Sequence, residues 1–253
     1  MNPSDDRLES MTLRGAWDRH AQDWIRWART PGHDLFFWQF GLPHFLELLP
    51  EPGRLTVDAG CGEGRLTRIL RDEGHRIAGF DASGQLARAA VTHPDAAPSA
   101  VADAASLPLK AAGADLYVSY MVLQDVDDLD GVVRESARVL GGGGRACFAI
   151  IHPAQSALDL DAATPAARSY FAPRRITDVV ERDGLRMTFE SEHRPLERYA
   201  RALEDAGFLI EAIREPVPDQ ALIAALPSAA KFADVPWAIF IRAIRALWAG
   251  SKG

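Results

Sequence analysis

One stretch, residues 55–65, constrains the fold of this chain more than any other. It begins as a short apolar run and ends in three glycines at alternate positions, Gly60, Gly62 and Gly64. Beyond the glycines, the apolar side chains take the spacing of one helix face, at Leu66, Ile69 and Leu70. The pattern predicts a buried strand, a tight turn and the start of a helix. Glycine lets a backbone turn sharply and approach a ligand, and the first N–H groups of a helix are free to bind one.

The glycine turn does not match a dinucleotide-binding site. Such a site needs a glycine or alanine three places after its second glycine, to let the helix pack closely on the strand. Arg65 stands at that place. The turn therefore favours another ligand, and the ends of the later strands must indicate which one.

Acidic residues follow the next two predicted strands. Residues 76–80 end at Asp81, which lies 19 positions after Gly62 (81 minus 62), and residues 99–102 end at Asp103-Ala104. The first distance brings the ends of neighbouring strands together in an α/β unit. Asp81 is then suited to accept the two hydroxyls of a ribose, and Asp103 to bind an adenine amino group. The alternatives are a helix cap for Asp81 and an ordinary loop position for Asp103.

The bulk composition sets limits on the class of protein. With 253 residues, 47% hydrophobic and 25% charged, the chain has the size and balance of one globular α/β domain. The net charge of −7 disfavours nucleic acid as the main partner, because phosphate binding needs a basic surface. No apolar run reaches membrane-spanning length, residues 1–10 do not read as a signal peptide, and the two cysteines suggest no disulfide framework. A cytoplasmic location without a membrane is expected, and a homodimer is left open.

Several motifs recur in the order of a known family. They are the segment from Val57 to Gly64, Asp81, Asp103-Ala104, the strand 114–120 (Ala-Asp-Leu-Tyr-Val-Ser-Tyr) and Arg138-Val139-Leu140 before four glycines. Together they resemble the class I S-adenosylmethionine-dependent methyltransferases, most of all the small-molecule branch related to ubiquinone and menaquinone biosynthesis. The resemblance implies S-adenosylmethionine as cofactor. It also implies a cofactor site formed by eleven residues: Asp58, Gly60, Cys61, Gly62, Gly64, Asp81, Ala82, Asp103, Ala104, Tyr120 and Met121.

The expected fold is a doubly wound, mostly parallel α/β sheet of seven strands. The resemblance implies that the last strand, 237–243, inserts antiparallel between the fifth (145–151) and the sixth (208–214). We expect a single domain with four parts: an N-terminal helical lid over residues 1–50, a cofactor-binding half over 51–152, a substrate-side insertion over 153–195, and the rest of the sheet over 196–253. Helices are expected over 12–29, 34–49 and 221–231.

The insertion is predicted to be a β-hairpin. Asp183-Gly184 is a strong two-residue turn signal, and apolar and polar residues alternate on its C-terminal side at residues 185–190. A hairpin after the fifth strand would overhang the ligand-binding edge of the sheet. The alternative is a surface hairpin with no role in binding, or a dimer contact. Side chains expected near the substrate are Trp24, Gln124, Tyr170 and His193.

The chemistry implied by the resemblance is in-line transfer of a methyl group, which depends mainly on positioning. A base is needed when the nucleophile carries a proton, and His152, directly after the fifth strand and expected to face the ligand-binding cleft, is the first candidate. The acids at 125–130 are expected to form a solvated loop and a helix cap rather than hold a metal. The Asn/Asp-Pro-Pro-aromatic motif of nucleobase amino methylation is absent after the fourth strand, where residues 119–122 are Ser-Tyr-Met-Val. Transfer to oxygen or nitrogen of a small molecule is favoured. A tRNA-modifying enzyme and a non-catalytic binding module remain alternatives.

Overall fold

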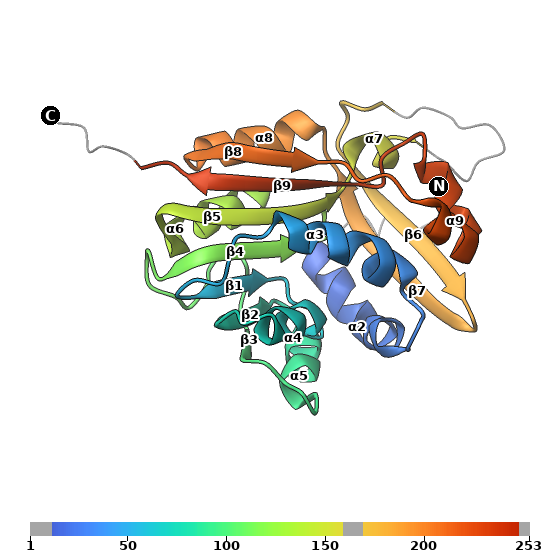
Figure 1. Ribbon diagram of the computed structural model, residues 1–253, viewed down its shortest axis with the longest axis horizontal. Helices are drawn as coiled ribbons and strands as arrows, with labels where there is room; N and C mark the ends of the chain where they lie inside the picture. Colours follow the sequence, from blue (N-terminus) through green and yellow to red (C-terminus); the bar gives the residue numbers. More distant parts are fainter. Residues whose placement is uncertain (1–11, 159–168, 248–253) are drawn as a thin grey trace, which may run out of the picture.

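A seven-stranded sheet forms the centre of the molecule, which a computed structural model describes for residues 12–158 and 169–247. The strand order is β3-β2-β1-β4-β5-β9-β8 (Figure 1). Strands β1 to β5 are parallel, and β9 lies antiparallel between β5 and β8. The strands are β1 (Thr56–Ala59), β2 (Ile77–Asp81), β3 (Ser99–Val101), β4 (Ala114–Tyr120), β5 (Leu140–Ile151), β8 (Phe208–Arg214) and β9 (Ala238–Arg245). This confirms the predicted fold class and the antiparallel insertion of the last strand.

The strand order reverses between β1 and β4. From β1 the chain adds β2 and β3 on one side, then crosses back to place β4 and β5 on the other. The helices that leave β1 and β4 therefore diverge, which opens a crevice at the carboxyl ends of these two strands. The acids and glycines predicted to bind the cofactor lie at the carboxyl ends of β1, β2 and β3 or shortly after them, at this edge.

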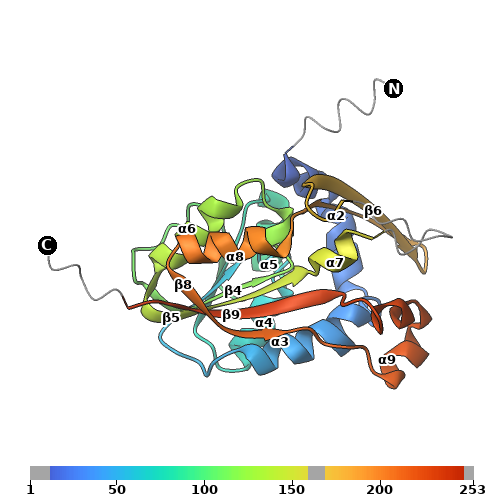
Figure 2. The same ribbon diagram turned by 90° about the horizontal axis from the view of Figure 1, so that it is seen from above.

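Two apolar cores cover the two faces of the sheet. On one face the buried side chains of β1, β4 and β5 pack against helices α6 (Leu129–Val139) and α8 (Leu196–Asp205). On the other face, buried side chains of β4, β5 and β9 pack against α3 (Leu42–Leu48) and α4 (Arg65–Asp72). Figure 2 shows these two helix pairs on opposite sides of the sheet. Burial of β5 on both faces explains its continuous apolar run from Ala146 to Ile150.

The predicted hairpin is present and lies against the N-terminal helix. Strands β6 (Arg174–Arg182) and β7 (Leu185–His193) pair antiparallel around Asp183 and Gly184, both at positive φ (50° and 77°), as a two-residue hairpin turn requires. Helix α2 (Leu13–Arg29) packs on β7, and both lie beyond the end of the main sheet (Figures 1 and 2). The side chain of Met187 is fully buried there.

Three element boundaries differ from the sequence expectation. Strand β5 begins at Leu140, ahead of the four glycines expected to form a turn, because Leu140 pairs with Ala114 before a shift in register. The helix expected over 221–231 is divided into α9 (Gln220–Ala225) and the 3-10 segment η3 (Pro227–Phe232), since Leu226 precedes a proline. The helix expected over 34–49 begins as a π-helical segment, η1 (Phe36–Gly41), before α3.

Helix α5, the 3-10 turn η2 and the short helix α7 complete the described chain. Helix α5 (Gly84–Thr92) follows β2, and its N-cap Ser83 accepts a hydrogen bond from the backbone N–H of Leu86. The 3-10 turn η2 (Leu123–Asp125) follows β4, and the short helix α7 (Pro153–Ser156) follows β5. Both η2 and α7 therefore begin at the carboxyl edge of the sheet.

Candidate functional site

The glycine turn between β1 and α4 is tied to the neighbouring strand. The N–H groups of Gly60 and Cys61 both donate to the carbonyl oxygen of Phe80, at 2.7 and 3.0 Å. Gly60, Gly62 and Gly64 have φ of 78°, 58° and 86°, a region that favours glycine. A Cβ on Gly60 would lie 2.4 Å from a methyl group of Val122. The close approach of the loop after β4 therefore requires glycine at this position.

Asp81, at the end of β2, holds the turn in place. Its carboxylate accepts hydrogen bonds from the N–H of Gly62 at 2.8 Å and from the N–H of Ser83 at 2.9 Å. Burial raises the pKa of Asp81 to about 6, against the opposing effect of these two bonds. The carboxylate lines the cavity beside the glycine turn.

A second buried acid lies beneath the same turn. Asp58 is 1% exposed and accepts a hydrogen bond of 2.6 Å from the hydroxyl of Thr67. Burial raises its pKa to about 7, and the negative charge of Asp81 adds to this effect. Burial also raises the pKa of the adjacent Cys61 thiol well above its usual range, so this side chain is a neutral part of the wall. The turn thus combines backbone N–H groups with two buried acids. A positive charge bound nearby would favour the ionised forms of these acids.

The end of β3 brings Asp103 and Ala104 to the same cavity. Asp103 is exposed, accepts a hydrogen bond from the N–H of Ala105, and lies 3.6 Å from the guanidinium of Arg14 on α2. Ala82 also lines the wall, next to Asp81. Gly64 does not: it is the N-cap residue of α4, behind the turn.

The end of β4 contributes Tyr120 and Met121. Met121 has φ of 56°, a strained backbone conformation for any residue other than glycine. Its N–H donates a hydrogen bond of 2.7 Å to the carbonyl oxygen of Ala149. The Tyr120 ring packs on Phe37 and Phe45, and a Cβ on Gly41 would overlap its hydroxyl. Tyr120 therefore lines the cavity, while its hydroxyl points toward Gly41 at the end of η1.

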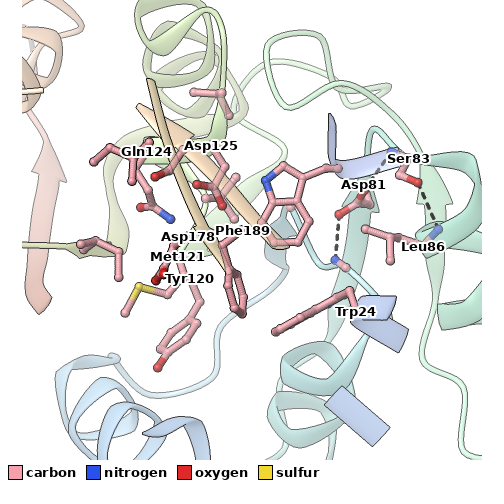
Figure 3. A pocket seen from close by; sticks show the side chains of 18 of the residues that line it. Trp24, Asp81, Ser83, Leu86, Tyr120, Met121, Gln124, Asp125, Asp178 and Phe189 are labelled. Atoms are coloured by element: carbon pink, nitrogen blue, oxygen red, sulfur yellow. Dashed lines mark hydrogen bonds between the residues drawn. The ribbon is translucent and has the colours of Figure 1, made fainter. Parts of the chain in front are cut away.

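These segments surround one cavity of about 1220 Å³. Figure 3 shows Asp81 and Ser83 on one side of it and Met121, Gln124 and Asp125 on the other. The volume exceeds the roughly 300–1,000 Å³ common for a single ligand, so the cavity has room for two. The cavity continues away from the glycine turn to an aromatic end formed by Phe36, Phe232 and Trp237, where the Phe36 ring packs on the other two.

Helix α2 and the hairpin form a roof over the cavity. Trp17 and Trp24 of α2 and Phe189 of β7 meet edge to face, with ring centroids 6.0 to 6.3 Å apart. The indole Nε1 of Trp24 lies 3.2 Å from where a Cβ on Gly62 would be. Arg65, at the position that excludes a dinucleotide site, stacks on Phe37 and pairs with Asp34. The roof thus reaches directly over the glycine turn.

Asp127 fastens this roof to the sheet. Its carboxylate accepts hydrogen bonds from the N–H groups of Leu13 and Arg14, the first residues of α2, at 2.9 and 3.4 Å. It also pairs with Arg175 of β6 at 2.8 Å. One side chain of the loop after β4 therefore holds both roof elements.

Loss of the Asp127 carboxylate is expected to loosen the roof. We predict that Asp127→Ala speeds hydrogen exchange in α2 and β6 and lowers the free energy of unfolding by about 1 kcal/mol, typical of a lost helix cap. Asp130→Ala is the matched control, because Asp130 pairs with Arg198 between α6 and α8, outside the roof. Equal exchange rates in the roof of Asp127→Ala and the native protein would contradict this role.

Three of the residues predicted to act as a base or to contact the substrate do not line the cavity. His152 was expected to face it, but its Nδ1 accepts a hydrogen bond from the N–H of Ala154 and its Nε2 contacts Glu215 at 2.8 Å. Burial lowers the pKa of His152, against the effect of Glu215. His193 is likewise engaged on both ring nitrogens, by Ser156 and the carbonyl of Tyr170. The expectation that the His152 ring faces the cavity is therefore wrong.

Tyr170 is also directed elsewhere, since its hydroxyl accepts a hydrogen bond from the N–H of Leu196. Of the four substrate-side candidates, Trp24 and Gln124 line the cavity and Tyr170 and His193 do not. Sequence reasoning missed Trp17 and Phe189 as roof residues. The seven-residue spacing of Trp17 and Trp24 on one helix face was the available signal.

Some buried polar atoms in residues that line the cavity have no hydrogen-bond partner, so a ligand could bind to them. Among the described residues these include Trp17 Nε1 and Gln124 Oε1, and both residues line the cavity. Within the same described ranges, no group of three or more His, Cys, Asp or Glu side chains is arranged to hold a metal ion. No helix in the described part of the chain has the length and apolar character needed to span a membrane.

Comparisons with known proteins agree with this geometry. A family model described as a methyltransferase domain matches residues 57–148. A crystal structure of an S-adenosylmethionine-dependent methyltransferase from Mesorhizobium loti is 28% identical, with a TM-score of 0.65 over 80% of this chain and 96% of that one.

Two curated relatives differ in how much of each chain aligns with this one. The ubiquinone/menaquinone biosynthesis C-methyltransferase UbiE of Caulobacter vibrioides is 27% identical over 97% of this chain and 94% of its own. A malonyl-[acyl-carrier protein] O-methyltransferase of Enterobacter lignolyticus is 36% identical, but the match spans only 37% of either chain. The stronger local identity is therefore confined to about a third of that relative's length.

Proposed function

Because this chain belongs to the class I S-adenosylmethionine-dependent methyltransferases, we propose that it methylates an oxygen or nitrogen atom of a small-molecule acceptor by in-line displacement. One observation carries the proposal. The cavity at the ends of β1 to β4 continues past Met121 into a second, aromatic compartment under the roof. A roofed cavity of this volume suits two small ligands lying end to end. A folded polymer would need an open surface instead.

The cofactor fits the end of the cavity beside the glycine turn. In our assignment Asp81 accepts the ribose hydroxyls, Asp103 and Ala104 contact adenine, and the backbone at Gly60 and Gly62 holds the methionine part. Asp58, Cys61 and Ala82 complete the wall of the cofactor site. Gly64 does not line it but, as the N-cap residue of α4, lets the turn lead into that helix. The absence of Cβ atoms at Gly60 and Gly62, where Val122 and Trp24 approach closely, supports this assignment.

Residues past β4 then separate donor from acceptor. The bound cofactor supplies an electrophilic methyl group on a positively charged sulfur. Met121, held at positive φ, is assigned to lie beside that sulfur, with the acceptor between Met121 and the aromatic end. Holding both partners in line can lower the barrier by about 7–11 kcal/mol, so positioning supplies most of the catalysis.

The small-molecule proposal can be tested with S-adenosylmethionine carrying a labelled methyl group. The protein is incubated with this donor and, separately, with a panel of small phenols and amines and with total tRNA. We expect the label to enter the small-molecule fraction. Label in tRNA alone, combined with tRNA binding that weakens steeply with salt, would contradict the proposal and favour a tRNA-modifying enzyme.

Affinity for S-adenosylmethionine should depend on pH through Asp58 and Asp81. Their pKa values in the free protein are raised to about 7 and about 6, and the positive charge of the ligand favours their ionised forms. Affinity should therefore be full above about pH 7 and fall as the pH drops through 7 and then 6. The limiting slope is about tenfold per pH unit for each acid that must lose a proton. Calorimetric titration from pH 8 to pH 5.5 measures this, and a constant affinity across that range would contradict it.

A further inference from the structure

The turn η2, directly after β4, brings two polar side chains into the wall of the cavity. Gln124 and Asp125 follow Met121 by three and four residues, and both line the cavity. Figure 3 shows them on the side of Met121, away from Asp81 and Ser83. They therefore lie at the acceptor end of the cavity, on the far side of Met121 from the ribose-binding acid.

Gln124 has an unused hydrogen-bond acceptor. The residue is 5% exposed, and its Oε1 has no partner. Its side chain is hydrogen-bonded to the carboxyl group of Asp125, a contact that the amide N–H group donates. Because a buried oxygen without a partner is costly, a ligand that donates an N–H or O–H hydrogen would bind favourably here.

Asp125 differs from the other acids of the same loop. Asp127 pairs with Arg175, and Asp128 caps α6 through the N–H of Gly131. Within residues 12–158 and 169–247, no ion pair neutralises Asp125 at salt-bridge distance. Arg194, the nearby cation, donates its hydrogens to the carbonyls of Leu123 and Val126 and to Glu192.

The surroundings of Asp125 favour a bound proton. Burial raises the pKa of its carboxyl well above the usual range, while Gln124 and the charge of Arg194 act in the opposite direction. Tyr199 of α8 is close enough for its own pKa to be affected by Asp125, and Asp178 of β6 lines the same cavity. A carboxylate in such a place is a stronger base than one in water, and a positive charge bound beside it would favour its ionised form.

We propose that Asp125 receives the proton of the acceptor's nucleophile, that Gln124 orients the reacting group, and that the acceptor therefore carries an O–H or N–H group on an apolar, aromatic frame. This inference rests on the proposed function, because it names the acceptor chemistry of the same cavity. The aromatic end formed by Phe36, Phe232 and Trp237 would hold the frame.

The step balances in atoms and charge. The lone pair of the acceptor oxygen or nitrogen forms the new bond to the methyl carbon. The S–C bond breaks, and its electron pair stays on the sulfur. The O–H or N–H proton passes to the Asp125 carboxylate. The sulfur loses a positive charge as Asp125 loses a negative one, so the net charge inside the enclosed cavity is unchanged, which favours the reaction where charge is poorly solvated.

The inference can be tested without knowing the acceptor. Sinefungin has an amine-bearing carbon in place of the methylated sulfur, so it presents positively charged N–H groups where the methyl group would be. S-adenosylhomocysteine presents a neutral sulfur there. We expect the native protein at pH 7.5 to bind sinefungin at least about tenfold more tightly, as a charge-assisted contact allows. We expect Asp125→Asn to reduce this ratio to near one while leaving the affinity for S-adenosylhomocysteine unchanged.

Asp128→Asn is the matched control. It removes the same charge from the same loop, and asparagine is as good an N-cap as aspartate, so the ratio should remain at the native value. Gln124→Met, which removes the unpaired oxygen at similar volume, should also lower the ratio and provides a second test if Asp125→Asn does not fold. A native ratio near one, or an unchanged ratio in folded Asp125→Asn, would overturn the inference. Failure of the native protein to bind either analogue would instead contradict the cofactor assignment.

Discussion

Gly60→Ala is expected to lower the affinity for S-adenosylmethionine by at least about 100-fold, or roughly 2.7 kcal/mol. An alanine at φ of 78° is strained by about 1–2 kcal/mol. Its Cβ would also lie 2.4 and 2.6 Å from two methyl groups of Val122, an overlap of the kind that typically costs about 1–3 kcal/mol. The turn or the loop after β4 must move to relieve the overlap, and both line the cavity.

Gly84→Ala is the matched control for this substitution. Gly84 begins α5 at ordinary helical φ, and a Cβ there would meet no atom within 4 Å. Alanine should raise the free energy of unfolding by about 0.5–1 kcal/mol and leave the affinity unchanged. Calorimetric titration of both variants, with thermal unfolding to verify the fold, makes the comparison. Native affinity in folded Gly60→Ala would show that the turn does not hold the ligand.

Asp81→Ala carries the second large expected effect. The substitution removes the acceptor of the Gly62 and Ser83 N–H groups as well as the proposed acceptor of the ribose hydroxyls. Loss of these bonds should weaken S-adenosylmethionine binding by about 1–3 kcal/mol, which is roughly 5- to 150-fold. Adenosine, which carries the ribose but no methionine part, should lose a similar factor in affinity.

Asp72→Ala tests whether the loss reflects charge alone. Asp72 is exposed at the end of α4 and pairs with Arg71, away from the cavity wall. It changes the net charge as Asp81→Ala does, so its affinities should match those of the native protein. If Asp81→Ala weakened S-adenosylmethionine but not adenosine, the acid would contact another part of the ligand and the ribose assignment would be wrong.

The order of elements was predictable because local signals agree with the fold. The alternate glycines after a short apolar run, the 19-residue step to Asp81 and the turn at Asp183-Gly184 each reflect backbone requirements that nearby residues satisfy. The antiparallel place of β9 came from the family resemblance, since nothing in its apolar run specifies a neighbour. The start of β5 was not predictable, because the pairing of Leu140 with Ala114 and the shift in register before Arg145 form only in the folded sheet.

Side-chain direction at the site was less predictable, because distant partners decide it. His152 follows β5 as expected, yet Glu215, 63 positions later in the chain, draws its ring away from the cavity. Asp127 was expected to belong to a solvated loop, but it caps a helix that lies 114 positions earlier. The Tyr120 hydroxyl points to Gly41 because only a glycine leaves room for it. Such contacts have no local sequence signal.

The most direct test of this account is a crystal structure of the protein with S-adenosylhomocysteine. We predict ribose hydroxyls on the Asp81 carboxylate, adenine beside Asp103 and Ala104, and the sulfur next to Met121 with its open side toward Gln124 and Asp125. A ligand bound elsewhere, or a sulfur turned away from Asp125, would contradict the account.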